Sequence, residues 1–380
     1  MNIRSRVLAV CSALVVALLV CAVAVSAQDK KPAPKPDKAQ QAEIAAVVKI
    51  LDDVMAGQPA PSDYKFTWTN HSMKSRDNKA YVPFILAFEK GQTLPTSATY
   101  YIRAVNKASA ADTQKAVAAH KAAVEKAANL ARLDPENTDL ADAEAKLRAQ
   151  APKVEYGFED IKFLNLPSVP PTIQFRFPAA MGVAAGDYDV YVLIKESAAS
   201  LKDKKAQPKA GLLKVDLTVP NYWTEELAIS SVIVTNTTEQ LKAIPTAEEM
   251  ARSPYIFGLT KVTPSADFKF AKKDELSILF YIYNTGLDKT TGKPDLAVDY
   301  GFYVRADGKE KFFNKTTPQL LNASTLGPQF DVKAGHQLLG GQGIPLASFP
   351  EGEYRLEIKV LDKVTGKTKI ESLQFTVTAG

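Results

Sequence analysis

A stretch near the C-terminal end, Phe349–Val360, reads FPEGEYRLEIKV and constrains the fold more than any other part of the chain. From Tyr354 onward, apolar residues alternate with Arg, Glu and Lys. Period-2 alternation is typical of a β-strand with one buried face and one face in water. Gly352 precedes the strand, and a sharp turn favours glycine because glycine has no Cβ to clash at positive φ. The stretch therefore predicts a turn followed by a half-buried strand.

The same pattern occurs a second time near the middle of the chain. Gly186 lies two residues before Tyr188, and an alternating strand follows. A tyrosine at this position resembles the tyrosine corner of immunoglobulin-like sandwiches, whose hydroxyl bonds to the backbone of the corner. A simple turn before a good strand former would leave the same pattern. Because each copy is followed by one further strand pattern, we predict a mainly β protein with two tandem immunoglobulin-like β-sandwiches.

Residues 42–220 are predicted to form the first sandwich, and residues 221–380 the second. The boundary contains Pro220–Trp223, read PNYW, whose two large aromatic residues predict a packed joint rather than a loose linker. The first domain is predicted to begin with a helix at Ala42–Met55, because its apolar residues recur at steps of three and four. Tyr81–Glu89 is apolar on both faces, which is typical of a central strand.

The first 27 residues have the pattern of a secretory signal peptide. Two arginines precede an uncharged, mostly apolar run, and Val25–Ala27 offers small residues for cleavage. We expect cleavage after Ala27 and a secreted or periplasmic protein. An uncleaved membrane anchor and a lipoprotein attached through Cys21 are the alternatives. Residues 28–41 are rich in Pro and Lys and are predicted to form a disordered spacer.

Composition excludes several classes of function. Both cysteines, Cys11 and Cys21, lie within the predicted signal. The cleaved chain would therefore have no disulfide, no thiolate metal site and no cysteine nucleophile. The formal net charge is +5, and loss of Arg4 and Arg6 lowers it by two to +3. This charge is too small to indicate nucleic-acid binding.

Residues 107–151 interrupt the strand patterns with an Ala- and Lys-rich segment that contains no glycine. Ser109 and Asp112 form a capping signature, and Asp134–Pro135 is predicted to separate two helices. We predict an αα-hairpin inserted between strands of the first sandwich. Its seam is mostly alanine, so it is expected to be only modestly stable. A tolerated insertion and a partner-binding arm both fit this composition.

The sequence lacks the common catalytic and metal-binding motifs. No pair of the three histidines, His71, His120 and His336, has the spacing of a metal site. Gly340–Gly343 is rich in glycine, but no helix follows that could bind a phosphate, so a turn or bulge is predicted. We therefore predict no catalytic residue, no cofactor and no metal.

The phrase LDK-x-TGK occurs twice, at Leu287–Lys293 and Leu361–Lys367. Each copy joins two strand patterns, and Gly292 and Gly366 are predicted to take the left-handed position of a hairpin loop. A calcium loop needs several carboxylates, and each copy has one aspartate, so a turn is predicted.

Aromatic residues occupy both faces of two strand patterns in the second domain. Tyr281 and Tyr283 belong to the first of these strands and Tyr303 to the second. One face of each strand must be core. The other face, with these three tyrosines, is a candidate surface for stacking against a peptide or glycan. The alternative is that the neighbouring domain covers it, because sheets are often covered on both faces.

From about Tyr222 onward, the chain resembles the C-terminal region of bacterial secreted proteins described by a GWxTD motif. The resemblance rests on LAISSVIV at Leu227–Val234, on YIYN ending at Asn284, and on PLASFPEGEYRLEIKVLDKVTGK at Pro345–Lys367. The motif itself is absent, since the nearest run, Tyr222–Glu225, lacks both its Gly and its Asp. The resemblance implies a bacterial envelope setting and brings no catalytic residue with it.

These observations predict an exported, non-catalytic envelope protein that acts as a binding or scaffolding module for an envelope protein or a glycan. Nucleic acid is not expected as a partner, and membrane contact is expected only through the signal or an anchor. Two alternatives stay open. One is a periplasmic chaperone-like protein that pairs an exposed strand with client peptides. The other is an atypical hydrolase that uses a pair of carboxylates.

Overall fold

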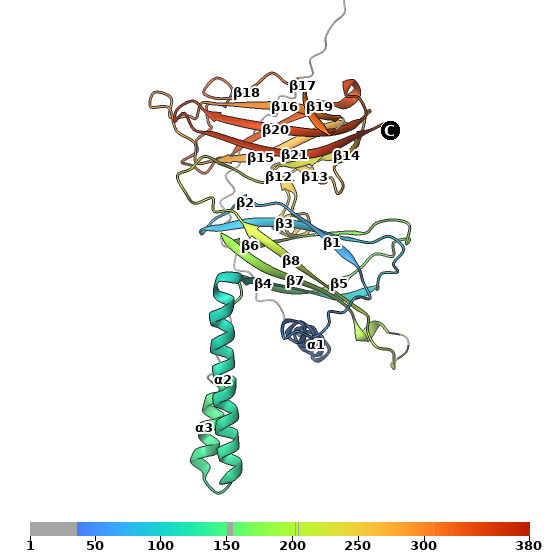
Figure 1. The fold of residues 1–380 in the computed structure, drawn as a ribbon, viewed down its shortest axis with the longest axis vertical. Coiled ribbons are helices and arrows are strands. Elements are labelled where there is room, and N and C mark those ends of the chain that lie inside the picture. The colour runs from blue at the N-terminus through green and yellow to red at the C-terminus, as the bar shows by residue number, and fades with distance from the viewer. Residues whose placement is uncertain (1–35, 150–154, 202, 204, 307) are drawn as a thin grey trace, which may run out of the picture.

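The computed structural model describes residues 36–149, 155–201, 203, 205–306 and 308–380. The protein is mainly β, as the sequence predicts, and its strands form several sheets (Figure 1). The elements of the first half are α1 (Lys38–Met55), β1 (Phe66–Asn70), β2 (Met73–Lys74), β3 (Lys79–Phe88), β4 (Ser97–Asn106), α2 (Lys107–Leu133), α3 (Thr138–Ala149), β5 (Phe158–Asn165), β6 (Arg176–Ala184), β7 (Gly186–Glu196) and β8 (Ala210–Val219).

The second half carries fourteen further helices and strands. They are β9 (Ala228–Ile229), β10 (Ile233–Thr235), β11 (Thr238–Gln240), α4 (Ala247–Arg252), β12 (Ile256–Phe257), β13 (Thr260–Val262), β14 (Lys269–Ala271), β15 (Glu275–Tyr283), β16 (Leu296–Ala306), β17 (Lys309–Lys315), β18 (Gln319–Leu321), β19 (Leu338–Pro345), β20 (Gly352–Asp362) and β21 (Thr368–Thr378).

Two sheets enclose the core of the first half. In one sheet β3 pairs with β1, β2 and β6, and the other has the order β5-β4-β7-β8. Alternate residues of each strand point between the sheets, so the apolar set of each strand faces the other sheet. The centre of this core contains Val82, Phe84, Leu86, Tyr100, Ile102, Val190 and Val192, all fully buried.

The second half repeats this arrangement. β15 pairs with β9, β10 and β19, and the facing sheet has the order β14-β21-β20-β16-β17, with β18 beside β16. In the first half the strand that begins at the corner glycine, β7, lies between β4 and the last strand, β8. In the second half the corresponding strand, β20, lies between β16 and the last strand, β21. A small sheet, β11-β13-β12, and the helix α4 lie in the chain between β10 and β14.

The two tyrosines that begin these strands occupy equivalent positions. The Tyr188 hydroxyl donates to the carbonyl of Ala184 at 3.0 Å, and the Tyr354 hydroxyl donates to the carbonyl of Pro350 at 2.8 Å. In each case the acceptor lies four residues upstream, and the tyrosine is 1% exposed. Gly186 and Gly352, which lie two residues before these tyrosines, have φ of 143° and 150°. Residues that carry a side chain rarely adopt such φ values.

The two LDK-x-TGK loops also have equivalent geometry. Gly292 and Gly366 take φ of 67° and 73°, so the predicted left-handed position is confirmed at both. The hairpin is confirmed only for the second loop, which joins the paired strands β20 and β21, because the first loop connects β15 to β16 of the facing sheet. Each glycine N–H donates to the carbonyl of the loop aspartate, Asp288 or Asp362, at 2.8 and 2.7 Å. The carboxylates of these aspartates accept backbone N–H groups of their own loops, which is the ordinary role of aspartate in a turn.

The first helix begins earlier than the sequence predicts. α1 starts at Lys38 rather than Ala42, because Asp37 and Gln40 form a capping box in which each side chain accepts the other's backbone N–H. Residues 38–41 are therefore helical and not part of a disordered spacer. The predicted signal, residues 1–27, and residues 28–35 of the spacer lie outside the described residues.

α1 covers the outer face of the sheet that contains β4 and β7 (Figure 1). Val47 and Leu51 are fully buried there against Tyr101 and Leu193. An ion pair strengthens the contact: Lys195 Nζ lies 2.7 Å from a carboxylate oxygen of Glu43, and both side chains are about nine-tenths buried. A second, at the C-terminal end of the helix, joins Arg103 to Asp52 at 2.7 Å.

Three local predictions need correction. The N-cap of α2 is Asn106, whose side chain accepts the N–H of Ala108, and not Ser109. The sequence pattern predicts a strand at His336–Leu339, but β19 begins at Leu338, because the His336 ring accepts the N–H of Asp331 at 3.0 Å and so belongs to the preceding loop.

Gly340–Gly343 is neither a turn nor a bulge. It forms the middle of β19, in regular antiparallel register with β15. A Cβ at Gly340 would lie 2.6 Å from the ring of Phe280, and one at Gly341 would lie 2.3 Å from the carbonyl oxygen of Ile278. The glycines are therefore required by the close approach of β15 and its side chains.

Candidate functional site at the domain joint and the helical arm

The two sandwiches meet through the outer faces of the sheets that contain β3 and β15 (Figure 1). On β3 the side chains that point away from the first core, Tyr81 and Ile85 among them, pack on the second domain. β15 contributes its own outward residues, and β10, β12 and β13 complete the contact. This explains why Tyr81–Glu89 is apolar on both faces: one face belongs to a core and the other to the joint. The buried residues of the hydrophobic cluster at the joint are Met73, Ile85, Ile233, Tyr255 and Val262.

The three tyrosines of the predicted aromatic surface do not lie together. Tyr281 packs in the joint, where burial raises its pKa to about 12. Tyr283 is buried beside it, and its hydroxyl accepts the N–H of Lys74 from the first domain at 3.1 Å. Tyr303 lies on the other sheet of the second domain, under the guanidinium of Arg355 at 4.2 Å from the ring centroid. Tyr281 and Tyr283 are therefore covered by the neighbouring domain, which was the alternative to an exposed binding surface.

A proline in β3 organises the polar centre of the joint. β1 ends opposite Phe84 and β2 begins opposite Tyr81, so Pro83, which has no N–H, lies opposite the interruption between them. The Pro83 carbonyl accepts the backbone N–H of His71 at 2.9 Å and the hydroxyl of Tyr255 at 3.1 Å. The interruption between β1 and β2 thus leaves the carbonyl of Pro83 to accept a hydrogen bond from Tyr255 of the second domain.

His71 completes this centre. Its Nδ1 lies 2.9 Å from the Tyr255 hydroxyl oxygen, and since that hydroxyl donates to Pro83, the ring nitrogen donates to the tyrosine. The side chain is 6% exposed, and burial lowers the pKa of His71 to about 4. Histidine is therefore neutral here at neutral pH and acts as a hydrogen-bond donor within the joint.

The chain between the domains is held by both of them. The Tyr222 hydroxyl donates to the carbonyl of Ser72 at 2.9 Å. Ser72 also exchanges hydrogen bonds with Ser231 of the second domain. Asn284, at φ 59°, donates to the carbonyl of Tyr222 at 3.1 Å. Lys74 Nζ lies 4.4 Å from the ring centroid of Trp223. Of the two aromatic residues predicted to pack here, Tyr222 is buried in the joint, whereas Trp223 is 43% exposed and only partly covered.

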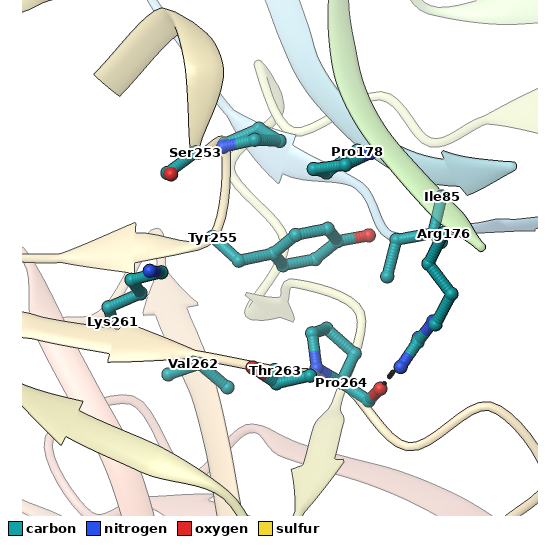
Figure 2. A pocket seen from close by; sticks show the side chains of 10 residues that line it. Ile85, Arg176, Pro178, Ser253, Tyr255, Lys261, Val262, Thr263 and Pro264 are labelled. Atoms are coloured by element: carbon teal, nitrogen blue, oxygen red, sulfur yellow. Dashed lines mark hydrogen bonds between the residues drawn. The ribbon is translucent and has the colours of Figure 1, made fainter. Parts of the chain in front are cut away.

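A cleft of about 180 Å³ lies at one side of the joint (Figure 2). β3 and β6 supply three of its residues, and the segment from the end of α4 to β13 and beyond supplies seven. Figure 2 shows Arg176 and Lys261 on opposite sides of the Tyr255 ring. The lining is mostly apolar and consists of Ile85, Arg176, Pro178, Ser253, Pro254, Tyr255, Lys261, Val262, Thr263 and Pro264.

The two cations of the cleft differ in their partners. Lys261 Nζ lies 3.3 Å from a carboxylate oxygen of Glu239. Arg176 forms no ion pair with a carboxylate of the described residues. Among these residues its one hydrogen-bond acceptor is the carbonyl of Pro264, to which Nη2 donates at 2.9 Å. Arg176 Nε is buried and has no hydrogen-bond partner within the described part of the chain. Burial lowers the pKa of Arg176, and the charges of Tyr255 and Asp267 act in the opposite direction.

The helical arm, α2 and α3, projects from the opposite side of the first sandwich (Figure 1). Asn106 is the last residue of β4 and also the N-cap of α2, so the strand continues into the helix without a loop. Lys107 Nζ pairs with Asp216 of β8 at 2.5 Å and with Asp189 of β7 at 3.5 Å. The direction of the arm is therefore set by the sheet from which it leaves.

The arm contributes little to any core. Among its described side chains none is buried, and its half-buried apolar residues include Val124, Ala127, Ala128, Ala131, Leu140 and Leu147. α3 has 12 residues and α2 has 27, so α3 covers only part of α2. Leu133, at the far end of α2, is 82% exposed, more than any other large apolar side chain of the described residues.

The histidines have separate structural positions. His71 lies in the joint, His120 on the arm and His336 in a loop, where its ring lies 5.8 Å from that of Phe330. Within the described residues, no group of three or more His, Cys, Asp and Glu side chains is arranged to hold a metal ion. None of the described helices is both long and apolar enough to span a bilayer.

No protein-family model matches the chain, and no curated protein matches it. Among solved structures it is similar to two crystal structures of Salmonella alpha-2-macroglobulin. One is the protein reacted with methylamine, at 9% identity, and the other is a point mutant, at 10% identity. Each alignment has a TM-score of 0.19 and covers 85% of this chain, which spans 17% of the length of that chain. A likeness of this degree supports no statement about fold or function.

Sequence reasoning missed the residues that shape the joint. Phe177, Ala179, Met181 and Val183 alternate in the sequence, and this signal was sufficient to place Arg176 on the opposite, outward face of a strand. What lies against that face depends on contacts with residues about ninety positions away, such as Pro264, and local periodicity carries no information about them.

Proposed function

We propose that the protein is an exported, non-catalytic binding or scaffolding protein of the bacterial envelope, and that the helical arm is the element that contacts its partner. The observation that carries this proposal is the arm itself: two helices that leave the sandwich, bury no described side chain and end in an exposed leucine. The arm adds nothing to the stability of either core. Ordering its residues nevertheless costs conformational entropy, which supports a role outside the fold.

The frame that carries the arm supports a scaffolding role. β4 continues into α2 without a loop, and two aspartates of the same sheet pair with Lys107 at the base. The joint is held by hydrogen bonds from both domains, including those of Tyr222 and Tyr255. An arm with a set direction on a rigid body presents its tip to a partner with little loss of entropy on binding.

The chemistry of the tip favours a protein partner. Leu133 and Leu130 are exposed on the same helical face, three residues apart, beside the turn of the hairpin. Apolar anchors of this kind are typical of protein–protein contacts rather than of glycan contacts, which need planar aromatic rings and polar groups. We propose that both sandwiches are immunoglobulin-like, which their shared strand order and paired tyrosine corners support.

The envelope setting rests on the sequence of the first 27 residues and on the resemblance to secreted bacterial proteins. N-terminal sequencing of the protein recovered from the periplasm tests it. We expect the first residue to be Gln28. A chain that keeps Met1 and stays with the membrane fraction would support the uncleaved anchor instead.

Site-specific photo-crosslinking tests the role of the arm. A photoreactive amino acid at position 133 is expected to crosslink to one discrete envelope protein in producing cells. The same amino acid at position 173 is the matched control, because Ile173 is also exposed but lies in a loop of the first sandwich. Leu133→Asp is expected to abolish copurification of that protein, and Ile173→Asp to leave it unchanged. Equal crosslinking at both positions would mean that the arm is a tolerated insertion.

A further inference from the structure

The cleft at the joint combines an apolar lining with one cation that lacks an acidic partner. Arg176 uses one N–H for the carbonyl of Pro264, while its Nε–H is buried and unpaired among the described residues. A guanidinium has five N–H donors, so most of those on Arg176 have no acceptor among the described residues, and a carboxylate in the cleft would supply one. We propose that this cleft is a binding site for a small apolar carboxylate, whose carboxyl group pairs with Arg176.

The shape and polarity of the cleft limit the ligand. A volume of about 180 Å³ is slightly larger than the cavity of about 150 Å³ that accepts benzene in an engineered protein. Pro178, Val262 and Pro264 offer apolar contacts, and Tyr255 offers the face of a ring. The cleft therefore fits an apolar group of about the size of a phenyl ring or a branched alkyl chain.

The charges of the cleft select one negative group. Lys261 is already paired with Glu239, so Arg176 is the only cation of the lining without an acidic partner among the described residues. A guanidinium matches the geometry of a carboxylate, with two parallel N–H donors. A dianionic phosphate would leave charge uncompensated in an apolar surrounding, which is costly. The site thus favours a monocarboxylate, whether a free acid or the C-terminal residue of a peptide.

Ligand-observed NMR titration of the full chain with three probes tests the proposal. Phenylacetate carries both features, phenylacetamide lacks the charge, and acetate lacks the ring. For a ligand of about ten heavy atoms, we expect phenylacetate to bind with a dissociation constant on the order of 1 mM. The amide and acetate are expected to bind at least about tenfold more weakly, because each loses one of the two interactions. Equal binding of phenylacetate and its amide would overturn the proposal, and so would no binding of phenylacetate at 20-fold higher concentration, about 20 mM.

Variants of the arginine give a second test. Arg176→Gln is expected to weaken phenylacetate binding about tenfold or more, and Arg176→Lys to give an intermediate loss, since lysine keeps the charge but not the fork. Arg305→Gln on β16 removes the same charge far from the cleft and is expected to bind as the wild type does. Wild-type affinity in Arg176→Gln would overturn the proposal. If that variant does not fold, Arg176→Lys and the comparison of acid with amide still decide it.

One further probe identifies the source of the carboxylate. N-acetylphenylalanine represents the end of a peptide chain, and tighter binding than phenylacetate would assign the site to apolar C-termini. Weaker binding would assign it to free acids, and both results support the carboxylate site. The cleft does not involve the arm, so these results and those of the crosslinking experiment succeed or fail separately.

Discussion

Protonation of His71 provides the sharpest test of how the joint is built. The ring is 6% exposed, donates to Tyr255 and has its pKa lowered to about 4 by burial, whereas an unfolded chain holds histidine near its ordinary value of about 6.5. Between these two values the unfolded state binds more protons than the folded state does. The stabilising contribution of neutral His71 is therefore complete above pH 6.5 and is lost as the pH falls towards 4.

The size of the effect follows from the two pKa values. A difference of about 2.5 units corresponds to about 3 kcal/mol once the pH has fallen below both values. Between pH 7.5 and pH 5 the same values give a loss of about 2 kcal/mol, because the folded state is still almost unprotonated at pH 5. A surface histidine would contribute nothing over this range.

Two measurements check this expectation. Because the chain has only three histidines, labelling of their ring carbons gives three NMR signals to follow with pH. One signal, absent in His71→Asn, is expected to show no titration above pH 5. Urea unfolding at pH 7.5 and pH 5, followed by tryptophan fluorescence, is expected to show an acid-induced loss that is about 2 kcal/mol smaller in His71→Asn than in the wild type. His120→Asn on the arm is the control and is expected to match the wild type.

Either of two results would refute the reasoning about His71. A midpoint near 6.5 for its signal would mean that water reaches the ring and that the joint opens in solution. An identical acid-induced loss in the wild type and His71→Asn would mean that other groups cause the pH dependence.

Three substitutions test other contacts through urea unfolding. Gly341→Ala is expected to cost about 1–3 kcal/mol, because its Cβ would lie 2.3 Å from a backbone carbonyl of β15, while Gly182→Ala, with no atom within 4 Å, is expected to be nearly neutral. Tyr354→Phe removes a hydroxyl that donates to a carbonyl at 2.8 Å and is expected to cost about 1–2 kcal/mol; a neutral result would contradict a structural role for the corner. Lys195→Met leaves the buried carboxylate of Glu43 unpaired and is expected to cost about 3 kcal/mol, most of which the further change Glu43→Gln restores.

The sequence predicted the features that depend on near neighbours. Alternation of apolar and polar residues depends only on the strand period, so the strands that begin at Gly186 and Gly352 could be placed correctly. The same holds for the positive φ of the loop glycines Gly292 and Gly366, because positive φ is a property of the loop itself. The break between the two arm helices after Leu133 follows from the proline that comes next but one.

Other features could not be read locally because distant residues cause them. Glycine is usual in turns, so Gly340 and Gly341 predicted a turn, but the side chain of Phe280 and a backbone carbonyl across the sheet require them in a strand. The aromatic residue Tyr281 looked equally suited to an exposed surface and to a covered one, since its own strand pattern is the same in both cases. Only the presence of β3 against it, about two hundred positions earlier in the chain, decides the matter.

The two candidate sites lie on opposite sheets of the first sandwich, and this separates their energetics. The cleft lies against β3 and β6, whereas the arm leaves from β4 of the facing sheet and is anchored to β7 and β8. A close-packed core lies between them, and contacts that share no residue usually contribute additively. A ligand in the cleft would contact both domains at the joint, because both supply its lining. A partner on the arm would contact the tip of α2. Substitutions at one proposed site are therefore expected to leave binding at the other unchanged.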